Sequence, residues 1–337
     1  MSLPDSTVPD SEDPALNGLT RPSQTSTVLQ IGVSLVLSVL VLGIIGYVTF
    51  EVDAFRELLQ NMQYGLLVGA VVVACARVWI GGERMRYVSQ GRLGIGGGIR
   101  GQLAWDFFSS ITPTVLGGGP VAAFYVARDE DLRIGDAAAL MFFCMLLNQL
   151  WFSVAIPVVL GASLFVDLIP TAAGTIGRQG LILSLAGLFI WSFMFAYATL
   201  IRPRLLVEGA GWLTRWPFLR RYRERIMREM RSYFRRARRL GRQSAIFYGW
   251  GFFLTALIWL SRYVLVVIIV KSVYAGGDAV LLFLRSAAMM LVSLLMVTPG
   301  GSGGIEGLYV LFIGPLIPEA MMAPTLLAWR LLGFYIF

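Results

Sequence analysis

Five runs of this sequence carry almost no charge, and each is long enough to cross a lipid bilayer as a helix. A transmembrane helix needs about 20 mostly apolar residues. The runs are Val28–Phe50, Tyr64–Gly82, Ala137–Val166, Gly180–Ile201 and Ile246–Val270. The whole chain is 57% hydrophobic and 14% charged, which is far more apolar than a soluble domain of average composition. The sequence therefore predicts an all-α, multi-pass membrane protein.

The pattern Thr-Pro-x-x-x-Gly-Gly occurs twice in apolar sequence, at Thr112–Gly118 and Thr298–Gly304. Proline removes a backbone donor and glycine opens positive-φ conformations, so each copy should break a helix. Broken backbone is tolerated in hydrocarbon only where protein buries it or where it lines a watery cavity. A break in each half of a transporter points to its binding site. We therefore expect two re-entrant helical hairpins, near 101–127 and near 280–318, with a site between them.

The charges of the connecting segments predict how the chain is oriented. The segment Glu51–Asn61 is mostly acidic, whereas Gly81–Arg100 carries four arginines. Cytoplasmic loops are enriched in arginine and lysine, so the second segment should be cytoplasmic, which also places the N-terminus in the cytoplasm. The same reading gives about six full spans in the cytoplasmic (inner) membrane.

Three predicted spans separate the two broken segments, so the hairpins should enter from opposite faces of the membrane. This is the arrangement of an inverted repeat, with an N-terminal half over 28–201 and a C-terminal half over 246–337. Arg77 precedes the first break and Arg262 precedes the second, and they are 185 residues apart against 186 for the two motifs. The near match suggests that the repeat extends beyond the motifs.

Two segments are predicted to lie outside the membrane core. Residues 1–26 are rich in Ser, Thr, Pro and Asp and predict a disordered tail. The segment 202–243 contains fourteen arginines and three glutamates, and apolar residues recur at three- and four-residue steps over Leu219–Leu240. This pattern predicts a cytoplasmic amphipathic helix that binds anionic lipid headgroups. It serves either as a membrane anchor or in regulation and substrate recruitment. Its local charge explains the basic net charge of +8 without a nucleic-acid partner.

The residue types present argue against intrinsic catalysis. The chain has no histidine and two cysteines, Cys75 and Cys144, which the apolar runs predict to be small buried hydrophobes rather than metal ligands or a disulfide. Ser302 lies between glycines but has no base nearby, because Lys271, the only lysine, lies at a helix end. No phosphate-binding loop ending in Gly-Lys-Ser/Thr is present. We expect no enzyme activity, no cofactor and no metal.

The second motif carries the clearest candidate site. A half-helix from about Ala279 should end at the break, and another should begin near Ile305. Glu306 would then lie in the first turn of the new half-helix, where the helix dipole favours a carboxylate. The amides of Gly303 and Gly304 would be free to face an anion. A charge at membrane depth calls for a partner, and the available arginines are Arg262, Arg285 and Arg330. The pair that Glu306 forms with one of them either has a functional role or is structural and holds the hairpin together.

The first motif lacks an acid of its own. Asp106 lies two turns before it and is either the carboxylate of this half or a charge near the membrane interface. Asn148 and Gln149 lie in the middle of the next span, where buried amides join helices or bind substrate. The candidate substrate-binding residues are therefore Arg77, Asp106, Thr112, Gly118, Arg262, Thr298, Gly303, Gly304, Glu306 and Arg330.

Three elements resemble the lysylphosphatidylglycerol synthase transmembrane-region family, described as the flippase domain of bacterial multiple-peptide-resistance proteins. Thr298–Glu306 is similar to its Pro-Gly-Gly-x-Gly-x-x-Glu signature, Arg330–Tyr335 to its final segment, and Thr112–Arg128 to its earlier Thr-Pro element. Family members often have an acid before the proline of the earlier element, where this chain has Gly119. The soluble aminoacyl-transfer domain is missing, so the resemblance implies no lysyl transfer. It implies movement of a lipid or lipid-linked group between leaflets.

The leading hypothesis is thus a lipid translocator, or flippase, whose partners are membrane phospholipids. The headgroup would enter a polar cavity between the hairpins, and its phosphate would be held by Arg77, Arg262 or Arg330 together with the glycine amides. Transport would be downhill or ion-coupled, and a homo-oligomer is compatible with the sequence. Two alternatives stay open: an accessory subunit or enzyme of lipid or lipid-linked glycan modification, and a secondary transporter of small solutes.

Overall fold

The structure, a computed structural model, describes residues 43, 62–112, 118–170, 174–200, 243–296, 298 and 301–336. Every secondary-structure element within these residues is helical. Four helices are long and apolar enough to cross a membrane: α3 (Tyr64–Ser89), α6 (Ile134–Ala162), α7 (Gly174–Leu200) and α11 (Ala245–Val273). The prediction of an all-α, multi-pass membrane protein is therefore confirmed.

Several predictions lie outside the described residues. These are the tail over 1–26, the first span over Val28–Phe50 apart from Gly43, and the basic helix within 202–242. Four candidate spans are described, so the count of six is not confirmed. Re-entrant hairpins and the inverted repeat also stay predictions, because they concern a membrane that the structure does not contain.

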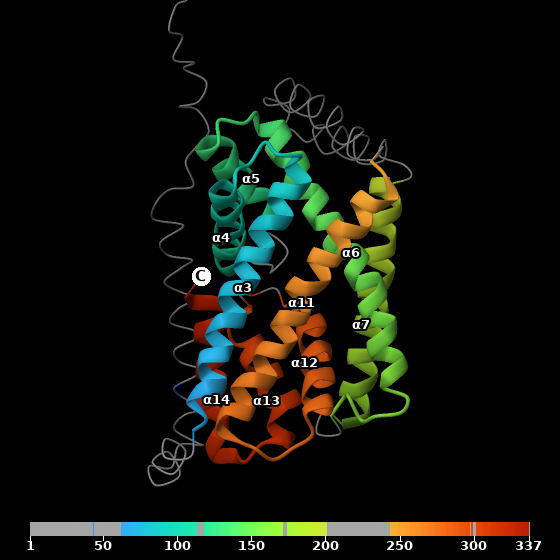
Figure 1. Cartoon of the computed structure of the whole chain (residues 1–337). Coiled ribbons are helices and arrows are strands. Elements are labelled where there is room, and N and C mark those ends of the chain that lie inside the picture. Colours follow the sequence, from blue (N-terminus) through green and yellow to red (C-terminus); the bar gives the residue numbers. More distant parts are fainter. Residues whose placement is uncertain are drawn as a thin grey trace, which may run out of the picture.

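Two pairs of shorter helices lie at opposite ends of the bundle (Figure 1). Near one end, α4 (Ile95–Ile111) packs against α5 (Gly118–Asp129). Near the other end, α12 (Ala279–Ser293) packs against α13 (Gly304–Ile313). α12 begins at the predicted residue but ends five residues before Thr298, and the chain continues through overlapping turns up to Met296. Proline disfavours helical backbone in the residue before it, so the break begins before Pro299 and not at the proline itself.

Close contact between α3 and α4 depends on glycine. A methyl group on Gly98 would collide with the backbone oxygen of Gly82, and one on Gly81 would collide with the side chain of Gln102. Small residues let the backbones of two membrane helices approach closely. The glycines therefore hold α4, which carries Asp106, directly against α3, which carries Arg77.

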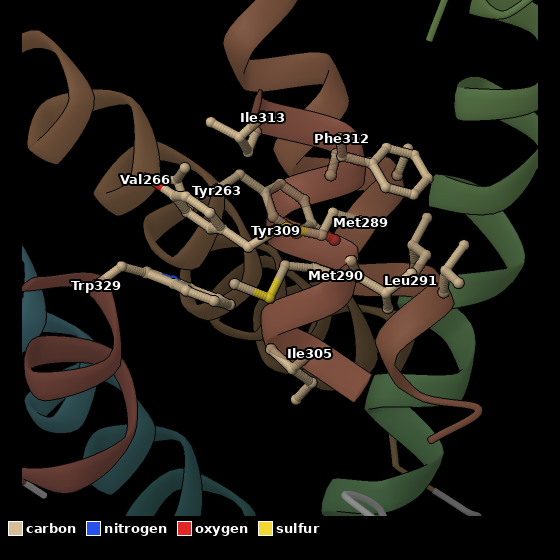
Figure 2. Packing of buried hydrophobic residues seen from close by; sticks show 14 of the residues in the cluster. Tyr263, Val266, Met289, Met290, Leu291, Ile305, Tyr309, Phe312, Ile313 and Trp329 are labelled. Atoms are coloured by element: carbon tan, nitrogen blue, oxygen red, sulfur yellow. The ribbon is translucent and has the colours of Figure 1, made fainter. Parts of the chain in front are cut away.

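The C-terminal helices complete the larger apolar core. The chain passes from α13 through two short 3₁₀ turns, η4 (Gly314–Leu316) and η5 (Glu319–Met321), into α14 (Met322–Arg330) and a π-helical turn η6 (Leu331–Tyr335). Figure 2 shows buried side chains of α11, α12, α13 and α14 meeting in one cluster, including Tyr263, Met290, Tyr309 and Trp329. The rings of Tyr309 and Trp329 are stacked with centroids 5.2 Å apart. This core fixes the positions of α11 and η6 beside the polar residues described next.

A buried arginine-rich cavity as the candidate functional site

Asp106 joins the two helices that precede the hairpins. Nη1 of Arg77 on α3 donates to Oδ2 of Asp106 at 3.0 Å, and Nη2 of Arg262 on α11 donates to Oδ1 at 3.2 Å. The side chains of Arg77, Asp106 and Arg262 are 2%, 11% and 18% exposed. Arg262 also lies over the ring of Trp259, with Cζ 5.5 Å from its centroid. Three candidate residues that are far apart in the sequence are thus brought together inside the bundle.

A third guanidinium, that of Arg84, lies in the same place. The first part of the predicted cytoplasmic segment Gly81–Arg100 is helical, because α3 continues to Ser89 and buries Arg84, and the side of the membrane on which it lies stays a prediction. Nη1 of Arg84 donates to Oδ1 of Asn148 at 2.9 Å and to Oγ1 of Thr255 at 3.4 Å. Both partners are neutral. Asn148 also accepts from Nε1 of Trp259 at 3.3 Å, so this amide joins α6 to α3 and α11, and whether it also binds substrate stays a prediction.

These side chains border one partly open cavity of about 60 Å³. A cavity needs only about 10–15 Å³ to hold one water, so this one has room for several. Its lining comes from α3, α4, α6, α11, the end of α12 and η6, and comprises Arg77, Arg84, Gln102, Trp105, Asp106, Ser109, Ser110, Asn148, Ile258, Trp259, Arg262, Leu294, Gly333 and Phe334. Among these residues three are cationic and one is anionic.

Glu306 and Arg330 form a separate pair that does not line this cavity. Nε and Nη2 of Arg330 both donate to Oε1 of Glu306, with Nε at 2.8 Å. The two side chains are 0% and 1% exposed. The guanidinium also lies over the ring of Phe334, with Cζ 4.7 Å from the centroid. The predicted pairing of Glu306 with an arginine is therefore present, and it ties α13 to α14.

The amide predicted to face a substrate anion already has a protein partner. The backbone N–H of Gly303 donates to Oε2 of Glu306 at 2.8 Å. Gly303 has φ of 83°, in the left-handed region that favours glycine, and it caps α13. The start of α13 does bind an anion, but that anion is the carboxylate of Glu306. Gly304 begins the helix in close contact with Met296.

Two of the three remaining candidates have local structural roles. Thr112 ends α4, and its hydroxyl donates to the carbonyl of Phe108 at 2.8 Å. Gly118 begins α5 so close to α4 that a methyl group there would collide with Ser109. The hydroxyl oxygen of Thr298 is buried without a hydrogen-bond partner among the described residues. None of the three lines the cavity.

An open apolar groove runs along α7 on the other side of Leu294. Its volume is about 510 Å³, and its lining consists of Ser184, Gly187, Leu188, Trp191, Leu294 and Leu295. Leu294 lines both the groove and the polar cavity. The polar cavity and the open groove therefore meet at Leu294.

Most of the other charges within the described residues lie near the helix ends. Arg100 donates to Asp129 and Glu130 and joins α4 to α5. The hydrogen bond that Arg100 donates to Asp129, followed by the one it donates to Glu130, raises the pKa of Arg100 above its ordinary value. Arg285, which the sequence offered as a partner of Glu306, instead donates to the backbone carbonyls of Asp167 and Phe312.

Sequence reasoning missed Arg84, Gln102, Ser109 and Trp259 as parts of the site. One signal was available for Arg84, because it follows Arg77 by seven residues and so returns to the same face of α3 after two turns. The others lie one to two turns from a recognised residue of their own helix. Their convergence depends on how α3, α4 and α11 pack, which spacing along one helix does not reveal.

Comparison with known proteins gives a family-level match. The family model for the lysylphosphatidylglycerol synthase TM region matches residues 29–337. A UPF0104 membrane protein of Archaeoglobus fulgidus is 23% identical over 243 residues, which cover 69% of this chain and 70% of that protein. No solved structure matches this chain.

Proposed function

This chain belongs to the lysylphosphatidylglycerol synthase transmembrane-region family, and we propose that it is a translocator that moves a phospholipid or lipid-linked headgroup between leaflets. The observation that carries the proposal is the buried cavity where Arg77, Arg84 and Arg262 surround a single carboxylate. Charged groups at membrane depth are costly and mark substrate pathways by default. Guanidinium groups bind phosphate through several donors in a fixed planar geometry.

The position of the cavity supports transport. Its lining includes α4 and the end of α12, which belong to hairpins at opposite ends of the bundle. If α4–α5 and α12–α13 are re-entrant, a group held between them is reachable from either leaflet after one hairpin moves. That is how broken helices serve alternating access in other transporters. α3 before the first hairpin and α11 before the second pack against each other, which is compatible with an inverted repeat.

The groove on α7 supports a lipid rather than a small solute. A lipid translocator must hold a headgroup in polar surroundings while its acyl chains remain in hydrocarbon. Leu294 is the common wall of a polar cavity and an apolar groove, so displacement of this side chain would join the two spaces. The proposed cycle needs no chemical step in the protein. The cytoplasmic orientation of the N-terminus and an inner-membrane location remain part of the proposal.

Headgroup exchange in proteoliposomes tests this function. The full chain is reconstituted with a trace of headgroup-labelled phospholipid, and a membrane-impermeant reductant removes the label that reaches the outer leaflet. We expect Arg262→Gln to slow exchange by about tenfold or more, because a lost hydrogen bond to a charged group costs about 1.5–3 kcal/mol. Arg92→Gln is the control, since Arg92 is 41% exposed and pairs with Asp136 at the surface. If liposomes with and without protein lose label equally, the protein is not a translocator of that lipid.

A further inference from the structure

The charge of the cavity lining restricts the ligand that the cavity suits. Arg77 and Arg262 share the carboxylate of Asp106, whereas the guanidinium of Arg84 hydrogen-bonds only to neutral groups among the described residues. Three cations and one anion leave the lining with a net charge of +2. Other described carboxylates have arginine partners elsewhere, as in Glu306–Arg330, Glu83–Arg86 and Asp136–Arg92. No second carboxylate among the described lining residues balances the excess.

Several buried polar atoms of the lining residues lack partners within the described part of the chain. These are Nε of Arg84, Nε of Arg262, Oγ of Ser109 and Oε1 of Gln102. The first three can donate hydrogen bonds, and the last is an acceptor. Buried polar groups are normally satisfied, so such a cluster in one cavity requires an explanation, for example an absent ion or water. A phosphate group supplies acceptors for the three donors, and a bridging water or phosphate hydroxyl supplies a donor for Gln102.

The cavity has room for one phosphate group. Its volume of about 60 Å³ holds several waters, which is enough for a phosphate but not for acyl chains, so the rest of a lipid would have to extend beyond the cavity. Trp105, Ile258 and Phe334 contribute apolar walls. Charge interactions in such low-dielectric surroundings are far stronger than in water, and this makes the number of charges on the ligand important.

We infer that the cavity is a site for a dianionic phosphate, the end of a phosphate monoester or diphosphate, and that it discriminates against phosphodiesters. A monoester carries about −1.5 to −2 charge at pH 7 and so balances the net charge of the lining, whereas a diester carries one negative charge and leaves one cation uncompensated. Arg84 is the guanidinium available to this ligand, because its existing partners are neutral. The inference rests on the proposed function for its lipid source, but the phosphate chemistry is shared by a lipid monophosphate and free phosphate.

Methyl phosphate and dimethyl phosphate provide a matched test, since they differ by one methyl group and one charge. The full chain is purified in detergent, and binding is measured by calorimetry and by the rise in Tm that a ligand of the folded state produces. At pH 8 we expect methyl phosphate to bind at least about tenfold more tightly than dimethyl phosphate, which corresponds to about 1.4 kcal/mol. Below the second ionisation of the monoester, near pH 6, this preference should shrink. Equal binding of both compounds, or binding of neither, would overturn the inference.

Two variants test whether the preference for the monoester arises in the cavity. Arg84→Gln should abolish the preference for the monoester, and Arg92→Gln should leave it unchanged. Because Arg84 is fully buried and its loss can impair folding, Ser109→Ala is the second variant, which removes one unpartnered donor and should weaken methyl phosphate binding by several fold. An unchanged preference in folded Arg84→Gln protein, or unchanged methyl phosphate binding in Ser109→Ala protein, would place the binding elsewhere and refute the assignment.

A further comparison, of two lipids with inorganic phosphate, identifies the source of the phosphate. Short-chain phosphatidic acid, a monoester, is compared with short-chain phosphatidylglycerol, a diester, and with inorganic phosphate. Tighter binding of phosphatidic acid than of inorganic phosphate supports a lipid ligand, and equal binding supports free phosphate as the ligand of the same site. Exchange of phosphatidylglycerol without dianion preference would support translocation and refute this inference. Dianion preference without any exchange would support the inference and refute translocation.

Discussion

Arg77 and Arg262 lie 185 residues apart and donate to opposite oxygens of the same carboxylate, that of Asp106. Each arginine comes from the helix that precedes a hairpin, α3 in one case and α11 in the other. The contact between the two halves of the molecule is thus electrostatic as well as apolar. Its loss should affect both the stability of the fold and the properties of the cavity.

Asp106→Asn should destabilise the protein more than a comparable change at its surface. Removing one partner of a buried ion pair leaves an uncompensated charge and typically costs about 3–5 kcal/mol. We expect a lowered Tm in detergent, measured by loss of tryptophan fluorescence or by aggregation. Asp129→Asn is the control, because Asp129 is 31% exposed and pairs with Arg100 at the surface, where such pairs contribute about 0–1 kcal/mol. Similar Tm values for the two variants would show that Asp106 contributes no more than a surface ion pair.

Glu306→Gln should destabilise the second hairpin, because it leaves Arg330 buried without a carboxylate and weakens the cap on Gly303. Adding Arg330→Met should restore part of the lost stability, since a buried pair replaced by apolar groups is often neutral. The two single variants and the double variant form a thermodynamic cycle that isolates the pairwise coupling. The prediction is contradicted if the stability lost in the double variant equals the sum of the losses in the two single variants.

The same set of variants separates a structural role of this pair from a transport role. Neither residue lines the cavity, so a folded double variant should retain headgroup exchange within a few fold of the wild type. Complete loss of exchange in a stable double variant would instead assign the pair to the transport path.

Gly98→Ala should weaken the contact of α4 with α3. The added methyl group meets a backbone oxygen of Gly82 that cannot move aside, and overpacking costs about 1–3 kcal/mol. Alanine regains up to about 1 kcal/mol of helix propensity, so we expect a net loss of about 1–2 kcal/mol, read as a lower Tm. Gly96→Ala is the matched control on α4, because its methyl group meets only the flexible end of Arg100 at 3.4 Å. A Gly98 variant as stable as the Gly96 variant would contradict the close approach.

Leu294→Ala should accelerate headgroup exchange by several fold, because it removes most of the wall between the polar cavity and the groove on α7. Leu294→Trp should slow it by closing that wall further. Leu295→Ala provides the control, since Leu295 lines the groove and not the cavity and is 38% exposed. The measurement is the proteoliposome assay described above. If both alanine variants behave like the wild type, lipid does not pass at this position.

Much of the helical framework could be predicted from hydrophobicity alone. The run Ile246–Val270 lies within α11, which extends it by one residue at its start and three at its end. Ser244 caps that helix by accepting from the amide of Phe247. The start of α12 at Ala279 and of α13 beside Ile305 also followed from the sequence, because Asp278 is a capping residue and glycine interrupts the helix. Local chemistry determines these boundaries, so local patterns reveal them.

The site was predicted less well, because its charges are satisfied by distant parts of the chain. Arg84 follows Glu83 and precedes Arg86, and three charges in four residues indicated a loop. In the structure Glu83 pairs with Arg86 outside, while Arg84 turns inward to Asn148. The pairing of Glu306 with Arg330 was easier to anticipate, because few charges occur in the apolar C-terminal half. Which arginine would reach Asp106 depended on helix packing that no single segment encodes.

The carboxylate of Glu306 occupies the start of α13 and is held there by Arg330. The first hairpin is also anchored by charge, but its anchor lies elsewhere: Asp106 holds α4 to Arg77 and Arg262 beside the cavity. An anion that enters the cavity would compete with Asp106 for these arginines and loosen α4, whereas the contact of α13 with α14 would stay intact.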